Sequence, residues 1–379
     1  MRILYINSDY YISSPHRVMV KHFLEAGTEM SVFVPVRRDA EEPSAVKDNE
    51  YVAPCFHTWD RLWFAGKQRK ILAAARNLPE DVLKADCIHA NMLFTDGNCA
   101  MALSRELEIP YVVAVRNTDV NVFFKYMVHL RDRGVEILKN AAAVFFLSPV
   151  YRDQVLDRYV PKEVRDAILR KAYVIPNGID EYWFDNLYRR ESADTGLPKD
   201  KPLTVLHVGD INGNKNLLLT AEGIQRLNRQ GWDIRYRVVG RVWEETIKTR
   251  LERYGFVSFL PPQPKEQLVH EYRAADIFVM PSHTETFGLV YAEAMSQGLP
   301  VIYTRGQGFD GQFPDGTVGY SVDSHDAEEL AANIVKICDR YHELSQNCVV
   351  SVQRFHWNRI VREYLQLYGE ISLNVHDAR

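Results

Sequence analysis

Cysteine is scarce in this sequence, and no stretch of it stays apolar over the length of a membrane span. The five cysteines among 379 residues are odd in number and scattered, so we expect no disulfide framework and a reducing, cytoplasmic location. A span needs about 20 consecutive apolar residues, and no run approaches that length. The first residues, Met-Arg-Ile-Leu-Tyr-Ile-Asn, are typical of a strand rather than of a secretory signal. The cysteines are Cys55, Cys87, Cys99, Cys338 and Cys348.

An excess of either charge is also missing. The chain has 46 basic and 50 acidic residues, a net charge of −4, so it lacks the basic surface typical of nucleic-acid binding, and we expect no such partner. After the first expected strand the chain continues with Ser8 to Tyr11 instead of a glycine-rich G-x-G-x-x-G fingerprint. This argues against a dinucleotide-dependent oxidoreductase.

Short apolar runs and amphipathic stretches alternate along the chain, which is typical of parallel β-sheets with helices on both faces. The length suits two such α/β domains, each able to bury its own core. The polar stretch from Arg189 to Gly196, followed by Pro198, has no apolar periodicity and is the expected linker between domains over 1–188 and 199–356. Strands are expected at 2–7, 30–34, 86–90, 111–115, 143–147, 172–175, 203–208, 234–239, 256–259, 276–280 and 300–303.

The segment from Ser282 to Met295 is the most informative part of the sequence. The apolar run 277–280 before it predicts a buried strand that ends at Pro281, and 289–297 predicts a helix that is closed by Gly298. The first backbone N–H groups of a helix have no partner within the helix and lie at its positive end. The N–H groups of Gly288, Leu289 and Val290 are therefore expected to bind a phosphate.

Two glutamates separated by seven residues flank this expected phosphate site. Glu285 lies on the loop beside the site, and Glu293 lies about two turns into the helix. Carboxylates accept hydrogen bonds from hydroxyls and N–H groups donate to a diphosphate, so the pair suits a nucleotide-sugar. The alternative is an ordinary strand–helix unit with solvated glutamates. The small neighbours of Glu293, Ala292 and Ala294, argue instead for the close approach of a ligand.

This E-x7-E element, with Phe-Gly-Leu at its centre, resembles the retaining glycosyltransferases of the GT-B fold, the group-one branch (family four). Further segments resemble landmarks of that family in the same order, and together they extend over nearly the whole chain. They are 89–90, 112–119, 175–180 (Ile-Pro-Asn-Gly-Ile-Asp), 206–209 with 215–216, 274–282 and 298–302.

The resemblance implies two facing Rossmann-like domains with an interdomain cleft, in which 1–188 binds the acceptor and 199–356 the donor. It also implies that the amphipathic helix in 357–379 folds back onto the first domain. The donor would be a nucleoside-diphosphate sugar, a UDP-sugar, and the acceptor a glycan, a lipid-linked saccharide or a small molecule. The nucleotide-sugar is a substrate, so no cofactor is expected. No two aspartates are spaced D-x-D, the pair that holds a divalent ion in the other major glycosyltransferase fold, and no metal is expected.

Carried over residue by residue, the family pattern predicts three groups of site residues. The catalytic group is Glu285, Lys215, Arg116 and Asp119. The residues of the first loop, expected to meet the acceptor or a phosphate, are Ser13, Ser14 and His16. The donor-binding group is Gly209, Lys215, Gly240, Arg241, Glu285, Phe287, Gly288, Leu289, Val290 and Glu293.

The chain departs from the family pattern at three places. Asp210 stands where the family usually has an arginine that clamps phosphate, so either Asp210 turns away or another cation, Arg241 or Arg116, replaces that arginine. Arg116 itself replaces a histidine, which favours a different acceptor, such as an anionic one. The first loop, 12–16, has serines in place of a glycine pair.

Other interpretations stay open at this point. The chain could bind a nucleotide-sugar without turnover, as a partner subunit, or could be a nucleotide-sugar epimerase on the same fold. The segment 59–70 mixes aromatic and basic residues. It could form an interfacial helix in peripheral contact with the inner face of a membrane, or a helix whose aromatics pack under their own domain.

Overall fold

The computed structural model describes residues 1–12, 14–41, 45–190, 197 and 202–377. The chain divides into two compact units, the first made of Met1–Leu147, Tyr151–Asn177 and Trp357–Arg379 and the second of Ser148–Val150 and Gly178–His356. Most of the linker predicted over 189–198 lies outside the described residues. The interdomain cleft stays a prediction.

The first unit is built on a parallel sheet in which seven strands are described, in the order β3-β2-β1-β4-β5-β6-β7. Alternate residues of each strand face opposite sides of the sheet. Leu4 and Ile6 of β1 therefore join one core, and Ile3 and Tyr5 join a second core on the other face. The strands are β1 (Arg2–Ile6), β2 (Glu29–Arg37), β3 (Glu50–Phe56), β4 (Cys87–Ala90), β5 (Tyr111–Val115), β6 (Ala143–Phe146) and β7 (Ala172–Val174).

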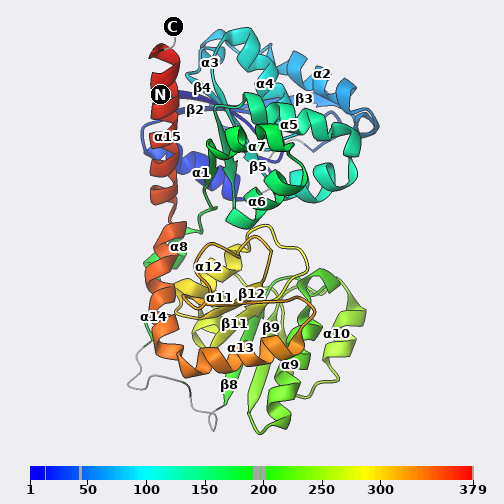
Figure 1. Cartoon of the computed structure of the whole chain (residues 1–379), viewed down its shortest axis with the longest axis vertical. Coiled ribbons are helices and arrows are strands. Elements are labelled where there is room, and N and C mark those ends of the chain that lie inside the picture. Colours follow the sequence, from blue (N-terminus) through cyan, green and yellow to red (C-terminus); the bar gives the residue numbers. More distant parts are fainter. Residues whose placement is uncertain (13, 42–44, 191–196, 198–201, 378–379) are drawn as a thin grey trace. The chain divides into compact units, whose positions relative to one another are not determined.

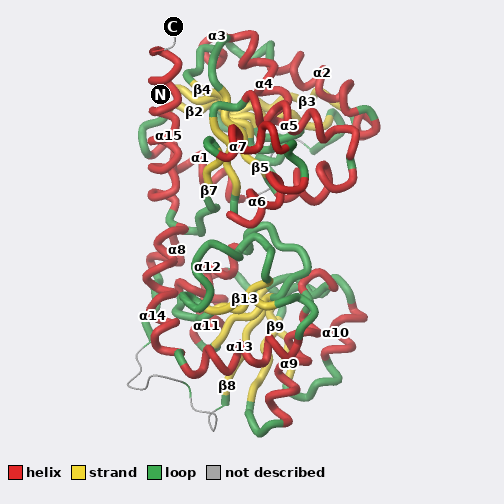
Figure 2. The backbone as a smooth tube through the Cα atoms, in the orientation of Figure 1, coloured by secondary structure: helices red, strands yellow, loops and turns green. Residues whose placement is uncertain are grey.

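Helices cover both faces of this sheet (Figures 1 and 2). The C-terminal helix α15 (Trp357–Asp377) packs along α1 (Ser14–Glu25), with Tyr368 stacked at 6.1 Å on Phe23 (Figure 1). The others are α2 (Phe64–Ala75), α3 (Glu80–Leu83), α4 (Thr95–Leu107), α5 (Arg131–Asn140), α6 (Pro149–Arg158) and α7 (Lys162–Leu169), with short helices η1 (Thr58–Leu62), η2 (Asp119–Phe124) and η3 (Val128–Leu130).

The second unit repeats the plan with a parallel sheet in which six strands are described, in the order β10-β9-β8-β11-β12-β13. They are β8 (Leu203–Val208), β9 (Ile234–Val239), β10 (Val257–Leu260), β11 (Ile277–Met280), β12 (Val301–Thr304) and β13 (Gly319–Val322). The helices are α8 (Glu181–Asp185), η4 (Gly213–Lys215), α9 (Leu217–Arg229), α10 (Glu245–Leu251), α11 (Lys265–Arg273), α12 (Leu289–Ser296), α13 (Ala327–Asp339), α14 (Tyr341–Ser351) and η5 (Val352–Phe355).

The structure confirms the α/β class, the parallel sheets and every expected strand to within a few residues. Two strands, β3 and β13, were not predicted. Both lie at a sheet edge, where a strand needs only one neighbour. Pro54 within β3 and Gly319 at the start of β13 (φ +149°) weaken the strand pattern in the sequence.

Candidate functional site

In the second unit, two strand ends meet at a pair of glycines. A Cβ atom on Gly240, which follows β9, would lie 1.8 Å from the carbonyl oxygen of Gly209, which follows β8. The Gly209 N–H also donates to the carbonyl of Val239 at 2.9 Å. The close backbone approach therefore requires a glycine at 240, while the φ of +150° at Gly209 favours glycine there. Both lie at the carboxyl edge of the sheet, where doubly wound folds bind ligands.

The structure brings Lys215 and Glu285 together, although 70 residues separate them in the sequence. Lys215 Nζ lies 2.7 Å from Glu285 Oε2, and the two side chains are only 21% and 14% exposed. They meet because β8 pairs with β11, so the loops that follow these neighbouring strands lie side by side. The backbone N–H of Lys215 is capped by Asn212 Oδ1 at 3.1 Å.

Two side chains that sequence reasoning missed, those of Asn214 and Gln307, hold this pair in place. Asn214 Nδ2 donates to the carbonyl of Thr284 at 3.0 Å, and Asn214 Oδ1 accepts from the N–H of Thr284 at 3.1 Å. On the other side, Gln307 Oε1 accepts from the N–H of Glu285 at 3.0 Å, and the Gly308 N–H donates to the Glu285 carbonyl at 2.9 Å. A glycine is needed at 308, since a Cβ atom there would lie 1.7 Å from the Thr286 carbonyl oxygen.

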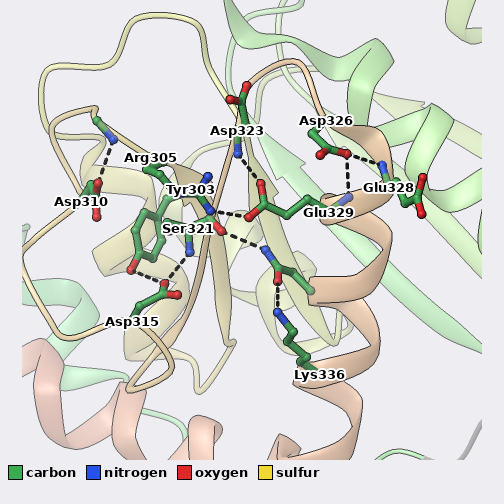
Figure 3. A network of polar contacts seen from close by, with 12 residues as sticks. Tyr303, Arg305, Asp310, Asp315, Ser321, Asp323, Asp326, Glu328, Glu329 and Lys336 are labelled. Atoms are coloured by element: carbon green, nitrogen blue, oxygen red, sulfur yellow. Dashed lines mark hydrogen bonds and ion pairs between the residues drawn. The ribbon is translucent and has the colours of Figure 1, made fainter.

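The loop with Gln307 and Gly308 is itself fixed by the polar network in Figure 3. Arg305 forms an ion pair with Glu329, and Asp310 Oδ2 accepts from the Gly306 N–H at 2.7 Å. Glu329 Oε2 also accepts from the Asp323 N–H at 2.9 Å. This network anchors the loop behind Glu285 to the start of α13.

The turn that was predicted to bind a phosphate leads into a helix, as expected. Gly288 has φ +74° and ψ 72°, in the left-handed region that favours glycine, and α12 begins at the next residue. Leu289 and Val290 therefore present the first N–H groups of the helix. Phe287 is 2% exposed and packs edge-on against Phe355 at 5.3 Å, so its side chain anchors the turn in the core.

Glu293 lies on the second turn of α12, where Tyr272 of α11 donates from its hydroxyl to Glu293 Oε2 at 3.1 Å. Burial raises the pKa of Glu293 to about 7. Ala292 and Ala294 are both fully buried. Packing of the helix in the core also accounts for their small size, so the approach of a ligand to Glu293 stays a prediction.

Asp210 pairs with Arg241: Oδ1 lies 3.6 Å from Nε, with side chains 42% and 62% exposed. The guanidinium also lies 4.3 Å from the ring centre of Trp243. Asp210 thus pairs with Arg241, one of the two cations that could replace the family's arginine, and the role of Arg241 as a phosphate clamp stays a prediction.

In the first unit, Arg116 is bound by neutral groups. Its guanidinium donates to the carbonyl of Asn91 at 3.1 Å, to Asn91 Oδ1 at 3.0 Å and to Asn177 Oδ1 at 3.3 Å. Asp119 is fully buried and accepts from the N–H groups of Arg116, Leu93 and Phe94 at 2.9–3.1 Å. Burial raises the pKa of Asp119 to about 6. In this conformation its carboxylate holds two loops and contacts no solvent.

The three residues predicted for the first loop are Ser13, Ser14 and His16. Ser13 lies outside the described residues, and Ser14 is the first residue of α1. His16 is 9% exposed, and its Nδ1 has no hydrogen-bond partner among the described residues. Burial, assisted by the nearby Arg116 charge, lowers the pKa of His16 to about 3, so the ring is neutral at neutral pH.

The segment 59–70 exposes two aromatic side chains: Trp59 is 65% and Trp63 58% exposed. Arg69 lies 4.9 Å from the Trp63 ring centre, and Lys70 pairs with Asp60 at 2.7 Å. Both tryptophans thus face outward, whereas Phe64 of the same segment packs against the core of its own domain, so the contact with a membrane stays a prediction. None of the described helices has the length and apolar character needed to cross a membrane.

Among the described residues, no group of three or more His, Cys, Asp or Glu side chains is arranged to hold a metal ion. That the reaction needs no metal stays a prediction. The five cysteines are all buried and unpaired.

Comparison with known proteins gives consistent matches over both units. Residues 17–182 match the family model described as Glycosyltransferase Family 4, and residues 189–353 match Glycosyl transferases group 1. A D-inositol 3-phosphate glycosyltransferase of Corynebacterium kroppenstedtii is 39% identical over 117 residues, which cover 30% of this chain and only 26% of that protein. The protein of the same name from Paenarthrobacter aurescens is 26% identical over 303 residues, covering 75% of this chain and 72% of that protein.

Solved structures share the fold over almost the full length. Sucrose-phosphate synthase from Thermosynechococcus elongatus has a TM-score of 0.71 at 20% identity, covering 98% of this chain and 99% of the other. Anabaena Alr3699/HepE in complex with UDP has a TM-score of 0.69 at 17% identity, covering 98% and 100%.

Proposed function

The chain belongs to the group 1 glycosyltransferases of family 4 and has their GT-B fold, and we propose that it transfers a sugar from a UDP-sugar to a saccharide or other hydroxyl acceptor with retention of anomeric configuration. The observation that supports this most directly is the Lys215–Glu285 pair, 2.7 Å apart, beside the turn at Gly288. A cation and helix N–H groups there would meet a diphosphate, and a carboxylate would meet sugar hydroxyls.

The chemical step places growing negative charge on the leaving diphosphate. Fixed donors aimed at that charge lower the barrier because they need no reorganisation. In the proposal, Lys215 and the N–H groups of Leu289 and Val290 are those donors. Glu285 positions Lys215 Nζ and accepts from a donor-sugar hydroxyl.

Glu293 is proposed to accept from the ribose hydroxyls of the nucleotide. Burial raises the pKa of Glu293 to about 7. Hydroxyls that donate to a carboxylate stabilise its charged form, so bound ribose would favour the charged form of Glu293 at neutral pH. Tyr272, which donates to Oε2, leaves the other carboxylate oxygen for the ribose.

Retention follows if the acceptor hydroxyl attacks on the face that the diphosphate leaves, and a leaving phosphate oxygen takes the proton. Such a step needs no protein base. The burial of Asp119 and its three backbone hydrogen bonds support a base-free step. The proposal also holds that no metal takes part.

Calorimetric titration with UDP, and with NAD as the control, tests the donor site, and a thermal-shift screen of nucleotide-sugars identifies the donor, which should raise the melting temperature by mass action. Release of UDP together with a new glycoside supports the transferase. UDP binding with neither product favours a non-catalytic binding subunit, and interconversion of the donor sugar favours an epimerase. Inositol 3-phosphate belongs in the acceptor screen because the relatives are named for it.

Peripheral membrane contact is a further part of the proposal, with the protein at the inner face of the membrane in a reducing cytoplasm. The exposed Trp59 and Trp63, with Arg69 beside Trp63, have the mixed aromatic and basic character of interfacial segments. Co-sedimentation with vesicles containing anionic lipid tests it: the W59A/W63A double variant should lose binding that the unchanged protein shows.

A further inference from the structure

The first unit contains a pocket of about 850 Å³ at the carboxyl edge of its sheet. Ser8 follows β1, Thr95 follows β4 and Thr118 follows β5, while Val36 and Phe56 come from the ends of β2 and β3. Five neighbouring strands thus contribute to it. Its volume is in the range of small-molecule sites, about 300–1,000 Å³.

Most of the pocket wall is apolar, and aromatic rings form part of it. Phe123 stacks on Phe94 with ring centres 4.6 Å apart and planes 11° from parallel, and Phe64 meets Phe123 edge-on at 6.0 Å. Phe123 belongs to η2, the helix that begins at the buried Asp119. The ring wall is therefore held in a fixed orientation. Large apolar side chains in the wall include Phe56, Phe64, Met92, Phe123, Met127 and Leu130.

Arg37 and Lys67, two cations in the described wall, contact different partners and do not converge on one point. Arg37 Nη1 donates to Thr58 Oγ1 at 3.1 Å and lies 3.8 Å from Asp39, and Lys67 Nζ lies 4.5 Å from the Phe56 ring centre. A phosphate group is held by several converging donors. Arg116, which the sequence linked to an anionic acceptor, binds Asn91 and Asn177 and is not part of the described wall.

We propose that this pocket receives an aromatic ring carried by the acceptor, so that the acceptor class is an aryl glycoside or a phenolic compound rather than a sugar phosphate. The proposal rests on the transferase function proposed above. Rings pair best edge-on or offset, and Phe64 and Phe123, two aromatic rings of the wall, would supply such partners to a ring in the pocket. Ser8, Thr95 and Thr118, at the strand ends, would orient the hydroxyls of the same molecule.

Titration calorimetry on the full chain, in the absence of a sugar donor, tests this proposal. The ligands are the phenyl, cyclohexyl, octyl and methyl β-D-glucosides. Phenol and cyclohexanol are titrated separately, so that an aromatic and a saturated ring are also compared without a sugar. Phenyl glucoside should bind at least tenfold tighter than methyl glucoside and tighter than cyclohexyl glucoside, and phenol should exceed cyclohexanol. Phe123→Leu and Phe64→Leu should each remove most of this preference. Phe256→Leu, a partly buried ring in the second unit, is the matched control and should leave it unchanged.

Equal binding of the aromatic and saturated probes would overturn the proposal, as would octyl glucoside binding more than tenfold tighter than phenyl glucoside, which would assign the pocket to a lipid chain. Tight binding of inositol 3-phosphate in place of the ring probes would overturn it too. Titration of UDP into the same sample distinguishes a failure of this inference from a failure of the proposed transferase function. UDP binding without ring binding rejects only this inference, whereas ring binding without UDP binding rejects the proposed transferase.

Discussion

Lys215 Nζ and Glu285 Oε2 form an ion pair of 2.7 Å between the loops that follow β8 and β11. Both side chains are mostly buried, and Glu285 is fixed from behind by Gln307 and Gly308. A pair held in this way keeps the ammonium group at one place. That geometry is what stabilisation of a leaving diphosphate requires.

Replacing Lys215 with alanine should therefore slow catalysis sharply. We expect a loss of about 2.7–4 kcal/mol of transition-state stabilisation, roughly 100- to 1,000-fold in kcat, as for other fixed donors to developing negative charge. The control is Lys248→Ala, which removes a partly exposed pair between Lys248 of α10 and Glu252, the residue that follows this helix. Steady-state kinetics with the identified donor measure both. A kcat within threefold of the unchanged enzyme would remove Lys215 from the reaction.

Glu293→Gln should separate nucleotide binding from stability. Glutamate in an unfolded chain has a pKa of about 4.3, whereas burial raises that of Glu293 to about 7. The folded state therefore binds the proton more tightly, and stability falls as the pH rises from about 4.3 to 7. The glutamine variant lacks this loss, so it should be the more stable protein at pH 8, by on the order of 2 kcal/mol, with little difference at pH 4.

The same variant should bind UDP about tenfold more weakly at pH 8, since a charge-assisted hydrogen bond contributes about 1.5–3 kcal/mol. In the unchanged protein, UDP affinity should rise as the pH rises through 7, and in the variant that rise should be missing. Calorimetry at pH 6 and 8 with urea unfolding measures both quantities. Unchanged UDP affinity would show that Glu293 does not contact the nucleotide.

The sequence predicted the elements of the proposed donor site better than their contacts. An apolar run, a glycine and a helix pattern placed β11, Gly288 and α12 correctly because each is a local signal. The meeting of Lys215 with Glu285 depends on β8 lying beside β11, which the sequence does not state. Asn214 and Gln307 were missed because their role is to bind loops distant in sequence.

The local sequence patterns also did not predict how deeply the side chains of the predicted site residues are buried. Phe287 was predicted to contact the donor, and its side chain is 2% exposed in the core. For Asp119 a signal was present: an aspartate three residues after Arg116 is placed to accept a backbone N–H, as it does at 2.9 Å. Capping explains that aspartate as well as catalysis does.

Turnover should survive removal of divalent ions. The proposed charge stabilisation comes from Lys215 and helix N–H groups, so assays with EDTA and with magnesium should agree within about a factor of two. Loss of activity in EDTA that manganese restores would contradict the metal-free mechanism.

Asp210→Arg should weaken UDP binding. Asp210 holds Arg241 at 3.6 Å, and a second cation would repel that guanidinium from its position over Trp243. Exposed pairs contribute about 0–1 kcal/mol, so the expected loss is two- to fivefold at low salt and smaller at high salt. Asp210→Asn, which removes the charge without adding one, should have the smaller effect. Tighter UDP binding by the arginine variant would show that Asp210 faces the phosphates.

Asp119→Asn tests whether the buried carboxylate is structural or catalytic. The carboxylate accepts three backbone N–H groups, and an amide of the same shape can accept with only one oxygen. The lost hydrogen bonds and the buried amide donor should lower the free energy of unfolding by about 1–3 kcal/mol. If Asp119 acts only by holding the loops, kcat per folded molecule should change less than about threefold, far below the 10²–10⁴-fold typical of a lost general base.

Urea unfolding and active-site-normalised kinetics on one preparation measure the two quantities, with Asp132→Asn as the surface control. A large fall in kcat with stability unchanged would mean that the loops open during turnover and expose Asp119 to the substrate, and the base-free mechanism would then be wrong.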